Sequence, residues 1–367
     1  MSIEVGGSSI GEVYAGSDAI SEIYKGNDLV WSAYAPEINY IFRNIDSNGN
    51  LTLATGALED ASEITKIADY GMHYAFYECE NLTGSVSFPN LKTIGTGGMY
   101  YAFNNCSSLN GTVSFPKLRS IGESGMYYLC YQCSGLIGSV SFPELVSISS
   151  YGMYYAFRNC ISLSGTISFP KLVSVGADGM TGCFFGCSNL TGGVVFPELI
   201  TVDEMSLNAT FANCSKITSV SFPKLTSIPH IYGLASCFSG CTNLSSVSLP
   251  ELTNVYTGGL ESTFANCVSL TSVSFPKLKV VTKATGWGTK HGGCKQCFSG
   301  CTSLESIYFY ALKNAGANSF QNMLSGVTGC VVHFPSNMES VIGSLSDVTS
   351  GFGGTNTTVL FDLPASE

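Results

Sequence analysis

Charged residues are scarce in this 367-residue sequence, because Asp, Glu, Lys and Arg together make up only 11% of it, against about a quarter in an ordinary globular protein. Basic residues are the minority, with 16 Lys and Arg against 26 Asp and Glu and a formal net charge of −10. The sequence therefore lacks a basic stripe for nucleic-acid phosphates or an anionic membrane surface, and we expect neither as a partner.

Long hydrophobic runs are also missing. No stretch approaches the ~20 apolar residues of a membrane span, so we expect no membrane insertion. Residues 1–7 lack the basic and apolar regions of a secretory signal peptide, which predicts folding in a reducing cytosol. The fifteen cysteines are then expected to be free thiols and not a disulfide framework.

Catalytic and cofactor motifs are absent as well. The four histidines, His73, His230, His291 and His333, are scattered along the sequence with no nucleophile elbow beside them. No phosphate-binding G-x-x-x-x-G-K-[ST] loop occurs. We therefore expect neither an enzyme nor a bound cofactor.

What the sequence does contain is a regular internal repeat. Segments such as NNCSSL, RNCISL and SGCTNL recur, and each places one cysteine in its repeat; six of the intervals between these cysteines are 27 residues, one is 26 and one is 34. A fixed period of this size predicts a solenoid in which each coil packs on the next. The cysteines of this ladder are Cys79, Cys106, Cys133, Cys160, Cys187, Cys214, Cys241, Cys267 and Cys301.

Each repeat combines two patterned segments. An alternating run that ends in Phe-Pro, as in residues 85–89, predicts a short strand that the proline ends. A Gly-Met-Tyr-Tyr segment places Met72, Ala75, Phe76 and Cys79 at the i, i+3, i+4 and i+7 spacing of a short helix. We therefore expect a right-handed α/β solenoid of about nine coils, with one short parallel strand and one helical turn per ~27-residue repeat.

The pattern A-F-x-x-C-x-x-L-x-x-[VI]-x-F-P-x-L-x-x-[IV] resembles the BspA-like leucine-rich repeat family over about residues 58–335. This sequence departs from the family repeat in being longer, with an additional Gly-Met-Tyr-Tyr turn. The resemblance implies a leucine-rich repeat coil and a non-catalytic recognition function, since family members are typically surface proteins that bind host molecules or other cells.

The two ends of the chain differ from the repeats. Residues 1–36 hold two copies of a decapeptide, with expected turns at Gly16-Ser17 and Gly26-Asn27, and are too short for an independent core. Residues 37–70 are expected to form a hairpin around Asn48-Gly49 and an N-terminal cap; Asp46, Asn48 and Asn50 otherwise suggest a calcium loop, without its glutamate. Residues 71–335 form the solenoid. Residues 336–367 are expected to cap it, with a helix that begins at Ser336 and presents Met338, Val341, Ile342 and Leu345 on one face.

The segment I-Y-K-G-N-D-L-V-W at residues 23–31 resembles short N-terminal modules of bacteriophage tail-associated and other structural proteins. It favours a phage virion protein, a tail or surface fibre, that docks to other virion proteins through residues 1–36 and attaches to a bacterial surface glycan or protein. The alternatives are a BspA-like adhesin on a bacterial cell surface and an intracellular protein-interaction scaffold. A homo-oligomer also stays open.

The cysteines suggest a structural ladder, because buried thiols behave as small hydrophobic groups. The alternative is a metal site at His291, Cys294, Cys297 and Cys301, whose side chains are of the kinds that bind zinc. Only His291 and Cys294 lie outside the repeat pattern, so the structural interpretation is favoured and no metal is expected.

Two surface columns are candidates for binding. In the helical interpretation one tyrosine column points outward and a second, which begins with His73, lies on its flank. Substituting Tyr101 and Tyr128 by Ala is then expected to weaken binding and leave the melting temperature nearly unchanged; otherwise the tyrosines only cover neighbouring coils. These ligand-binding candidates are Tyr74, Tyr101, Tyr128, Tyr155, Tyr100, Tyr127 and Tyr154.

The other candidate surface is a column of Ser and Thr hydroxyls on the strands, at outward positions such as Ser85 and Ser87. A flat hydroxyl ladder could bind a polysaccharide. Small side chains are also what a crowded parallel ladder accommodates, and we favour that structural interpretation.

Overall fold

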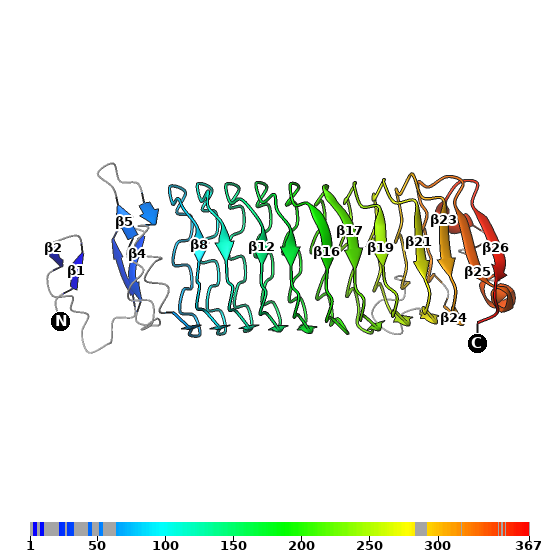
Figure 1. Ribbon diagram of the computed structural model, residues 1–367, viewed down its shortest axis with the longest axis horizontal. Helices are drawn as coiled ribbons and strands as arrows, with labels where there is room; N and C mark the ends of the chain where they lie inside the picture. Colours follow the sequence, from blue (N-terminus) through cyan, green and yellow to red (C-terminus); the bar gives the residue numbers. More distant parts are fainter. Residues whose placement is uncertain are drawn as a thin grey trace.

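The computed structural model describes residues 64–366 except 283–291, 317, 344, 346–347 and 349, together with the backbone of six short strands before residue 64. From residue 64 onward the chain winds into an elongated solenoid of about eleven turns, with β26 (Thr358–Leu363) in the last of them (Figure 1). Nine turns contain a ladder cysteine, and the additional two carry β25 (Val331–Pro335) and β26.

The six N-terminal strands form three antiparallel pairs. Strand β1 (Ile3–Val5) pairs with β2 (Ser8–Ile10), β3 (Glu22–Lys25) pairs with β4 (Asp28–Ser32), and β5 (Arg43–Ile45) pairs with β6 (Leu51–Leu53). The turns expected at Gly16-Ser17, Gly26-Asn27 and Asn48-Gly49 lie outside the described residues.

The strands predicted before the Phe-Pro steps line one side of the solenoid and pair in parallel. Pairing joins equivalent residues of successive coils, such as Val113 with Val86 and Ser114 with Ser87. Most of these strands stop before the proline, whose missing N–H cannot extend the ladder. They are β8 (Val86–Ser87), β10 (Val113–Ser114), β12 (Val140–Ser141), β14 (Ile167–Ser168), β16 (Gly192–Val195), β17 (Ile217–Ser221), β19 (Ser246–Ser248), β21 (Ser272–Phe275), β23 (Ser306–Phe309), β25 and β26.

A second row of parallel strands was not expected, because the repeat pattern predicts only one strand per coil. Most of these strands follow the buried leucine after a Phe-Pro step, as Ile94 follows Leu91. With two residues each, they are too short to produce an alternating pattern that stands out in the sequence. They are β7 (Lys66–Ile67), β9 (Thr93–Ile94), β11 (Ser120–Ile121), β13 (Ser147–Ile148), β15 (Ser174–Val175), β18 (Ser227–Ile228), β20 (Asn254–Val255), β22 (Val280–Val281) and β24 (Asn314–Ala315).

The Gly-Met-Tyr-Tyr segments are not helical, which corrects the expectation of a helical turn per repeat. Their N–H groups alternate between two acceptors: that of His73 bonds to the Tyr70 carbonyl of the same coil at 3.1 Å, and that of Tyr74 bonds to the Tyr100 carbonyl of the next coil at 2.9 Å. Every fourth residue is left-handed, with φ of 58° at Tyr70 and 54° at Tyr74. The segment is a ribbon of turns with a four-residue repeat, which sequence spacing does not separate from the 3.6 residues of a helix.

The fold is therefore a parallel β-solenoid of the leucine-rich repeat type with little helix. The helical segments of the described residues lie at the C-terminal end: the 3-10 turns η2 (Ser336–Met338) and η3 (Gly351–Gly353) and the single turn α2 (Glu339–Ile342). A helix in every coil would satisfy its N–H groups internally. The ribbon instead directs every second N–H to the next coil, so hydrogen bonds join successive coils on this side as well.

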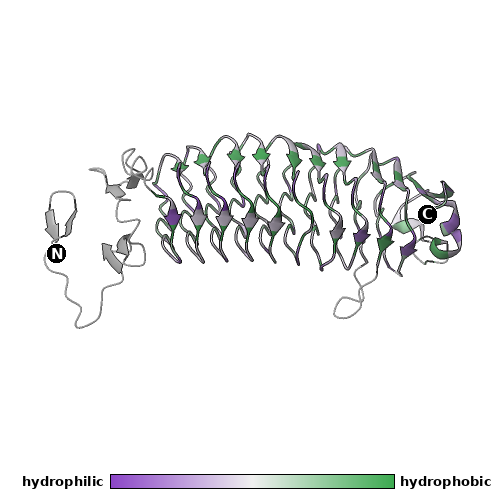
Figure 2. Ribbon diagram, turned by 60° about the horizontal axis from the view of Figure 1, so that its bottom comes forward, coloured by the Kyte–Doolittle hydropathy of each residue, from purple (hydrophilic) through white to green (hydrophobic). Residues whose placement is uncertain are grey.

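The core consists of columns of equivalent side chains that lie on top of one another through successive coils. Phe142 and Phe169 are fully buried or nearly so and stack with ring centroids 5.3 Å apart and an interplanar angle of 7°. Phe157 and Phe184 continue a second column at the same distance, and the two columns touch where Phe169 meets Phe184 edge-on at 6.4 Å. Hydrophobic residues accordingly recur at the same place in successive coils (Figure 2).

One coil differs from the others at two neighbouring buried positions and still fills the same core volume. Where other coils have Ala-Phe, as at Ala156-Phe157, this coil has Leu129-Cys130, and both side chains are fully buried. Leucine in place of alanine compensates for cysteine in place of phenylalanine, so the core stays filled.

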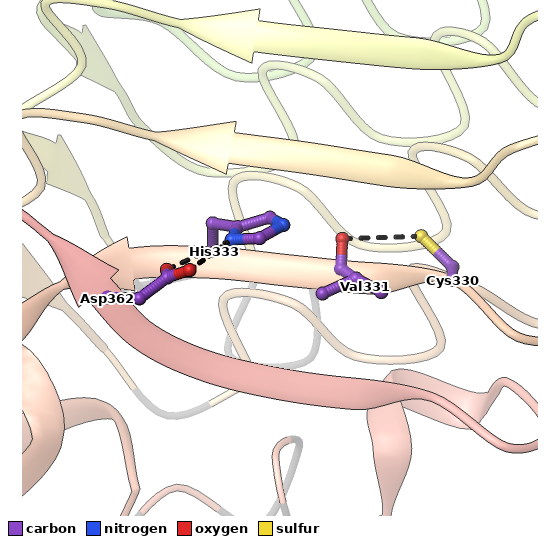
Figure 3. A network of polar contacts seen from close by, with 4 residues as sticks. All are labelled: Cys330, Val331, His333 and Asp362. Atoms are coloured by element: carbon purple, nitrogen blue, oxygen red, sulfur yellow. Dashed lines mark hydrogen bonds and ion pairs between the residues drawn. The ribbon is translucent and has the colours of Figure 1, made fainter.

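The last two coils close the C-terminal end of the core. Met338 and Ile342 are buried and Leu345 packs against the core, as expected, but Val341 is 38% exposed. The expectation for Val341 is wrong because α2 covers only Glu339–Ile342, so residues 338, 341, 342 and 345 do not lie on one face of a continuous helix. Strand β26 pairs with β25, and His333 Nδ1 lies 2.9 Å and 3.0 Å from the two carboxylate oxygens of Asp362 across this pair (Figure 3).

Candidate binding surface

The cysteine ladder lies inside the solenoid. All fifteen cysteines are buried and none forms a disulfide. Each ladder thiol from Cys106 to Cys301 also donates to a main-chain carbonyl of the preceding coil, as Cys133 Sγ does to Phe103 at 2.9 Å and Cys160 Sγ to Cys130 at 3.0 Å. A cysteine therefore fills the space of a small hydrophobic residue and supplies a donor between coils.

We expect the native protein to be inert toward thiol reagents. Burial raises the pKa of Cys187 and of Cys241 to about 12, so the reactive thiolate is suppressed at neutral pH. In a dithionitrobenzoate assay at pH 8, the folded protein should release almost no thionitrobenzoate, and protein unfolded in guanidinium should react at all fifteen thiols. Rapid reaction of folded protein would contradict burial of the ladder.

The candidate metal residues are only partly described. Cys294, Cys297 and Cys301 are buried, and burial raises the pKa of Cys294 and of Cys301 to about 12. His291 lies outside the described residues. Among the residues that the structure does describe, no three His, Cys, Asp or Glu side chains lie close enough to hold a metal ion.

Two histidines of the described residues each lie near an aspartate carboxylate. His230 Nε2 lies 3.7 Å from the Asp203 carboxylate at an exposed position, and His333 belongs to the last coils.

No helix in the described residues has the length and apolar character needed to cross a bilayer.

Part of the Ser and Thr ladder has a structural role. The Ser85 hydroxyl accepts the Thr112 N–H at 3.0 Å, and the Ser139 hydroxyl accepts the Thr166 N–H at 3.1 Å, so these hydroxyls bridge neighbouring coils. The ladder is also interrupted, because Val195 and Tyr308 occupy the outward position in two of the strands. A continuous hydroxyl surface along the sheet is therefore not present.

The tyrosine columns, in contrast, form one continuous surface over four coils, which we call the tyrosine face (Tyr74, Tyr100, Tyr101, Tyr127, Tyr128, Tyr154 and Tyr155). In one column Tyr101 stacks on Tyr128 with centroids 4.8 Å apart and an interplanar angle of 3°. In the other, Tyr100 stacks on Tyr127 at 4.8 Å and 5°. Neighbouring rings of the two columns also touch, at 4.8 Å between Tyr127 and Tyr128.

The structure corrects how these rings reach the surface. Tyr74 is 39% exposed, but the rings of Tyr101 and Tyr128 are half-buried by their neighbours and do not point fully outward as expected from a helix. Stacked aromatic pairs each contribute about 0.5–1.5 kcal/mol. The double substitution Tyr101→Ala/Tyr128→Ala should therefore lower the melting temperature, which revises the expectation that it would not.

The solenoid itself does not require tyrosine at these positions. The column of Tyr74 and Tyr155 continues in later coils as Gly182, Ala209 and Ser236, which share the left-handed φ of about 50–55°. Gly182 also leaves room for the ring before it, since a Cβ there would lie 2.1 Å from Tyr155. The same left-handed backbone recurs outside these columns, as at Asn105 and Gln132, so it belongs to the turn ribbon and not to the tyrosines.

Four of the tyrosine hydroxyls have no protein partner within the part of the chain that the structure describes, whereas the side chains of Tyr154 and Tyr155 are hydrogen-bonded to each other. In the described residues, no hydrogen-bond partner is found for the hydroxyls of Tyr100, Tyr101, Tyr127 and Tyr128, and none of the four is buried without a partner, so they reach solvent. Burial, with smaller effects of neighbouring phenolates, raises the pKa of Tyr127 to about 12 and also raises that of Tyr101. The face therefore presents neutral donors and acceptors throughout the physiological pH range.

The raised pKa values predict alkaline unfolding of these coils. A tyrosine in the unfolded chain ionises near pH 10, so its protonated form stabilises the fold fully below that pH, and this stabilisation is lost as pH rises toward 12. Absorbance at 295 nm should show these tyrosines ionising together with loss of the far-ultraviolet dichroism. Tyr101→Phe/Tyr127→Phe should shift this transition to higher pH; ionisation near pH 10 with the fold intact would contradict the burial.

Several members of this surface escaped sequence analysis. Tyr77 packs on Tyr74 at 5.1 Å, Tyr131 packs on Tyr128 at 4.9 Å, and Tyr151 packs on Tyr154 at 5.8 Å. The guanidinium of Arg158 lies over the Tyr155 ring at 4.6 Å and ends the face at its C-terminal side. Their spacing of three or four residues from the face was a usable signal, because residues so spaced lie side by side on a helix as well.

The coils are similar to those of known repeat proteins. The model of the BspA type leucine-rich repeat region matches residues 72–178, 153–285 and 293–343. Among solved structures, the chain is similar to a leucine-rich repeat protein from Bacteroides ovatus, at 20% identity over 84% of this chain and 87% of that one, with a TM-score of 0.41. It is also similar to a leucine-rich repeat protein of T. pallidum, at 22% identity over 63% and 88%, with a TM-score of 0.35. No match was found among curated proteins.

Proposed function

Because the chain belongs to the BspA type leucine-rich repeat family, we propose that it is a non-catalytic recognition protein, displayed on a surface, that binds a bacterial surface glycan or protein. The tyrosine face is the binding surface in this proposal. Rigid aromatic side chains with a hydroxyl offer contact area and hydrogen bonds at a low entropic cost, which suits them to recognition.

The observation that carries the proposal is the retention of tyrosine at positions where other coils use small residues. Ala209 and Ser236 hold the same left-handed backbone in later coils, so the ribbon forms without tyrosine at this position. Each stacked pair contributes about 0.5–1.5 kcal/mol, so stacking favours aromatic rings in these coils. Stacking does not require the hydroxyls of Tyr74, Tyr101, Tyr128 and Tyr155, and a ligand that binds the face would use them.

Adsorption of the labelled full-length protein to a panel of gut and soil bacteria tests the proposal. We expect saturable binding to some strains and at least about tenfold weaker binding for Tyr101→Ala/Tyr128→Ala, compared at a temperature well below the melting point of each variant. Tyr256→Ala/Tyr310→Ala is the matched control, since these exposed tyrosines lie outside the face. Equal losses in both variants, or adsorption that neither affects, would refute the role of the face.

The location of the displayed protein has two candidates. A phage virion is favoured by the segment I-Y-K-G-N-D-L-V-W in residues 23–31, part of which forms the β3–β4 hairpin; residues 1–36 would then dock to other virion proteins. A bacterial cell surface is favoured by the family resemblance. Tail, baseplate or capsid genes beside the coding sequence would support the virion, and a signal peptide upstream of Met1 would support the cell surface.

A further inference from the structure

The inner rings of the tyrosine face have their flat sides occupied by one another, whereas Tyr155 at the end of its column meets Tyr128 edge-on at 5.2 Å. Tyr101 lies between Tyr74 at 5.1 Å and Tyr128 at 4.8 Å, with interplanar angles of 13° and 3°. Tyr127 lies in the same way between Tyr100 at 4.8 Å and Tyr154 at 4.9 Å. A ligand therefore cannot stack on these rings from the side and meets ring edges and hydroxyls.

These hydroxyls form an array that repeats with the coils. Stacked rings follow at 4.8–5.1 Å along each column from Tyr74 to Tyr128 and from Tyr100 to Tyr154, the separation of neighbouring strands in a sheet. A ligand that lies along the axis can use every coil only if its own repeat matches this spacing. An extended peptide advances about 3.3 Å per residue and falls out of register after one coil.

The charged groups around the tyrosine face narrow the choice of ligand further. Within the array the side chains are neutral, and the nearby charged groups lie at its ends: Arg158 over Tyr155, Glu78 bonded to Tyr77, and Asp178 bonded to Tyr151. A single-stranded nucleic acid would need free ring faces and a basic groove, and the array has neither. A neutral chain rich in hydroxyl or amide groups fits instead.

We propose that the tyrosine face binds a linear, neutral glycan of equatorially (β-1,4) linked pyranose rings, which lies along the solenoid axis with one sugar ring per coil. In such a chain each ring advances by about its own length, close to the separation of the coils, and successive rings present hydroxyl or acetamido groups at their edges. This inference rests on the proposed function and names the ligand class of the same surface.

Calorimetric titration of the full-length protein with cello-oligosaccharides and N-acetylchito-oligosaccharides of two to six rings tests the inference. Affinity should rise steeply up to four rings, the number of coils in the face, and level off beyond. Malto-oligosaccharides of equal length, whose axial links coil the chain, should bind at least about tenfold more weakly. Tyr101→Phe/Tyr128→Phe keeps the stacked rings and should weaken binding about tenfold with the melting temperature retained; Tyr256→Phe/Tyr310→Phe is its matched control.

The outcomes separate this inference from the proposed function. Equal affinity for the malto series, affinity that does not depend on chain length, or loss of affinity in the control variant alone would overturn the register of one ring per coil. If no oligosaccharide binds while adsorption to bacteria still depends on Tyr101 and Tyr128, the face recognises another ligand and the glycan is refuted. If adsorption itself is absent, the proposed function fails first.

Discussion

Phe157→Ala should lower the free energy of unfolding by about 3–5 kcal/mol, the usual cost of removing a buried phenylalanine ring. Phe157 is fully buried, stacks on Phe184 at 5.3 Å and meets Phe142 at 6.5 Å. The coil before it has Cys130 in the same column, so no phenylalanine ring on that side can move in to fill the cavity.

The loss should also change how the solenoid unfolds. Each coil contacts only its neighbours, so weakening one interface uncouples the coils on either side. Guanidinium unfolding followed by circular dichroism should show a transition that broadens or splits in Phe157→Ala and stays single in Phe157→Leu, which should cost less. A change below about 1 kcal/mol in the alanine variant, outside the range expected for a fully buried ring, would show that this column is loosely packed.

Gly152→Ala should lower the free energy of unfolding by about 1–3 kcal/mol, the cost of overpacking a dense interior. A Cβ at Gly152 would lie 2.6 Å from Ile148 Cγ2 and 2.9 Å from the Ser149 carbonyl oxygen. The second contact is with main chain, which cannot move without shifting the turn ribbon that carries Tyr154 and Tyr155.

Ser206 provides the matched control for Gly152, because it occupies the same column in a later coil. Its side chain is fully buried, and its hydroxyl has no hydrogen-bond partner in the described residues. Ser206→Ala removes that unpaired hydroxyl and should leave stability unchanged or raise it. Thermal unfolding of both variants gives the comparison, and a Gly152→Ala variant as stable as the native protein would disprove the steric argument.

The stacking of the coils and the ends of their strands were predictable from particular residues. The recurrence of Cys106, Cys133 and Cys160 at 27-residue intervals predicted stacked coils, and the Phe-Pro steps predicted where strands such as β12 and β14 stop. Neither prediction depends on the backbone conformation in between, because only equal spacing is needed to superimpose equivalent residues in a solenoid.

The surface was predicted in composition but not in arrangement. Sequence analysis named the seven tyrosines and expected stacked columns of them, but it assigned them to a helix. The turn ribbon repeats every four residues, and its in-register coils stack Tyr100 on Tyr127 and Tyr101 on Tyr128. Arg158 and Tyr131 lie at the edge of this surface, three residues after Tyr155 and Tyr128, and sequence analysis did not name them.

The amino-acid sequence alone determined which side chains recur and therefore which ones meet between coils, because a fixed period brings identical positions together whatever path the chain takes. Only the tertiary structure decided that path: main-chain hydrogen bonds from one coil to the next replace the local bonds of a helix, and a spacing of about four residues is compatible with both. That choice turned the flat sides of the tyrosines toward each other and left their hydroxyls facing solvent.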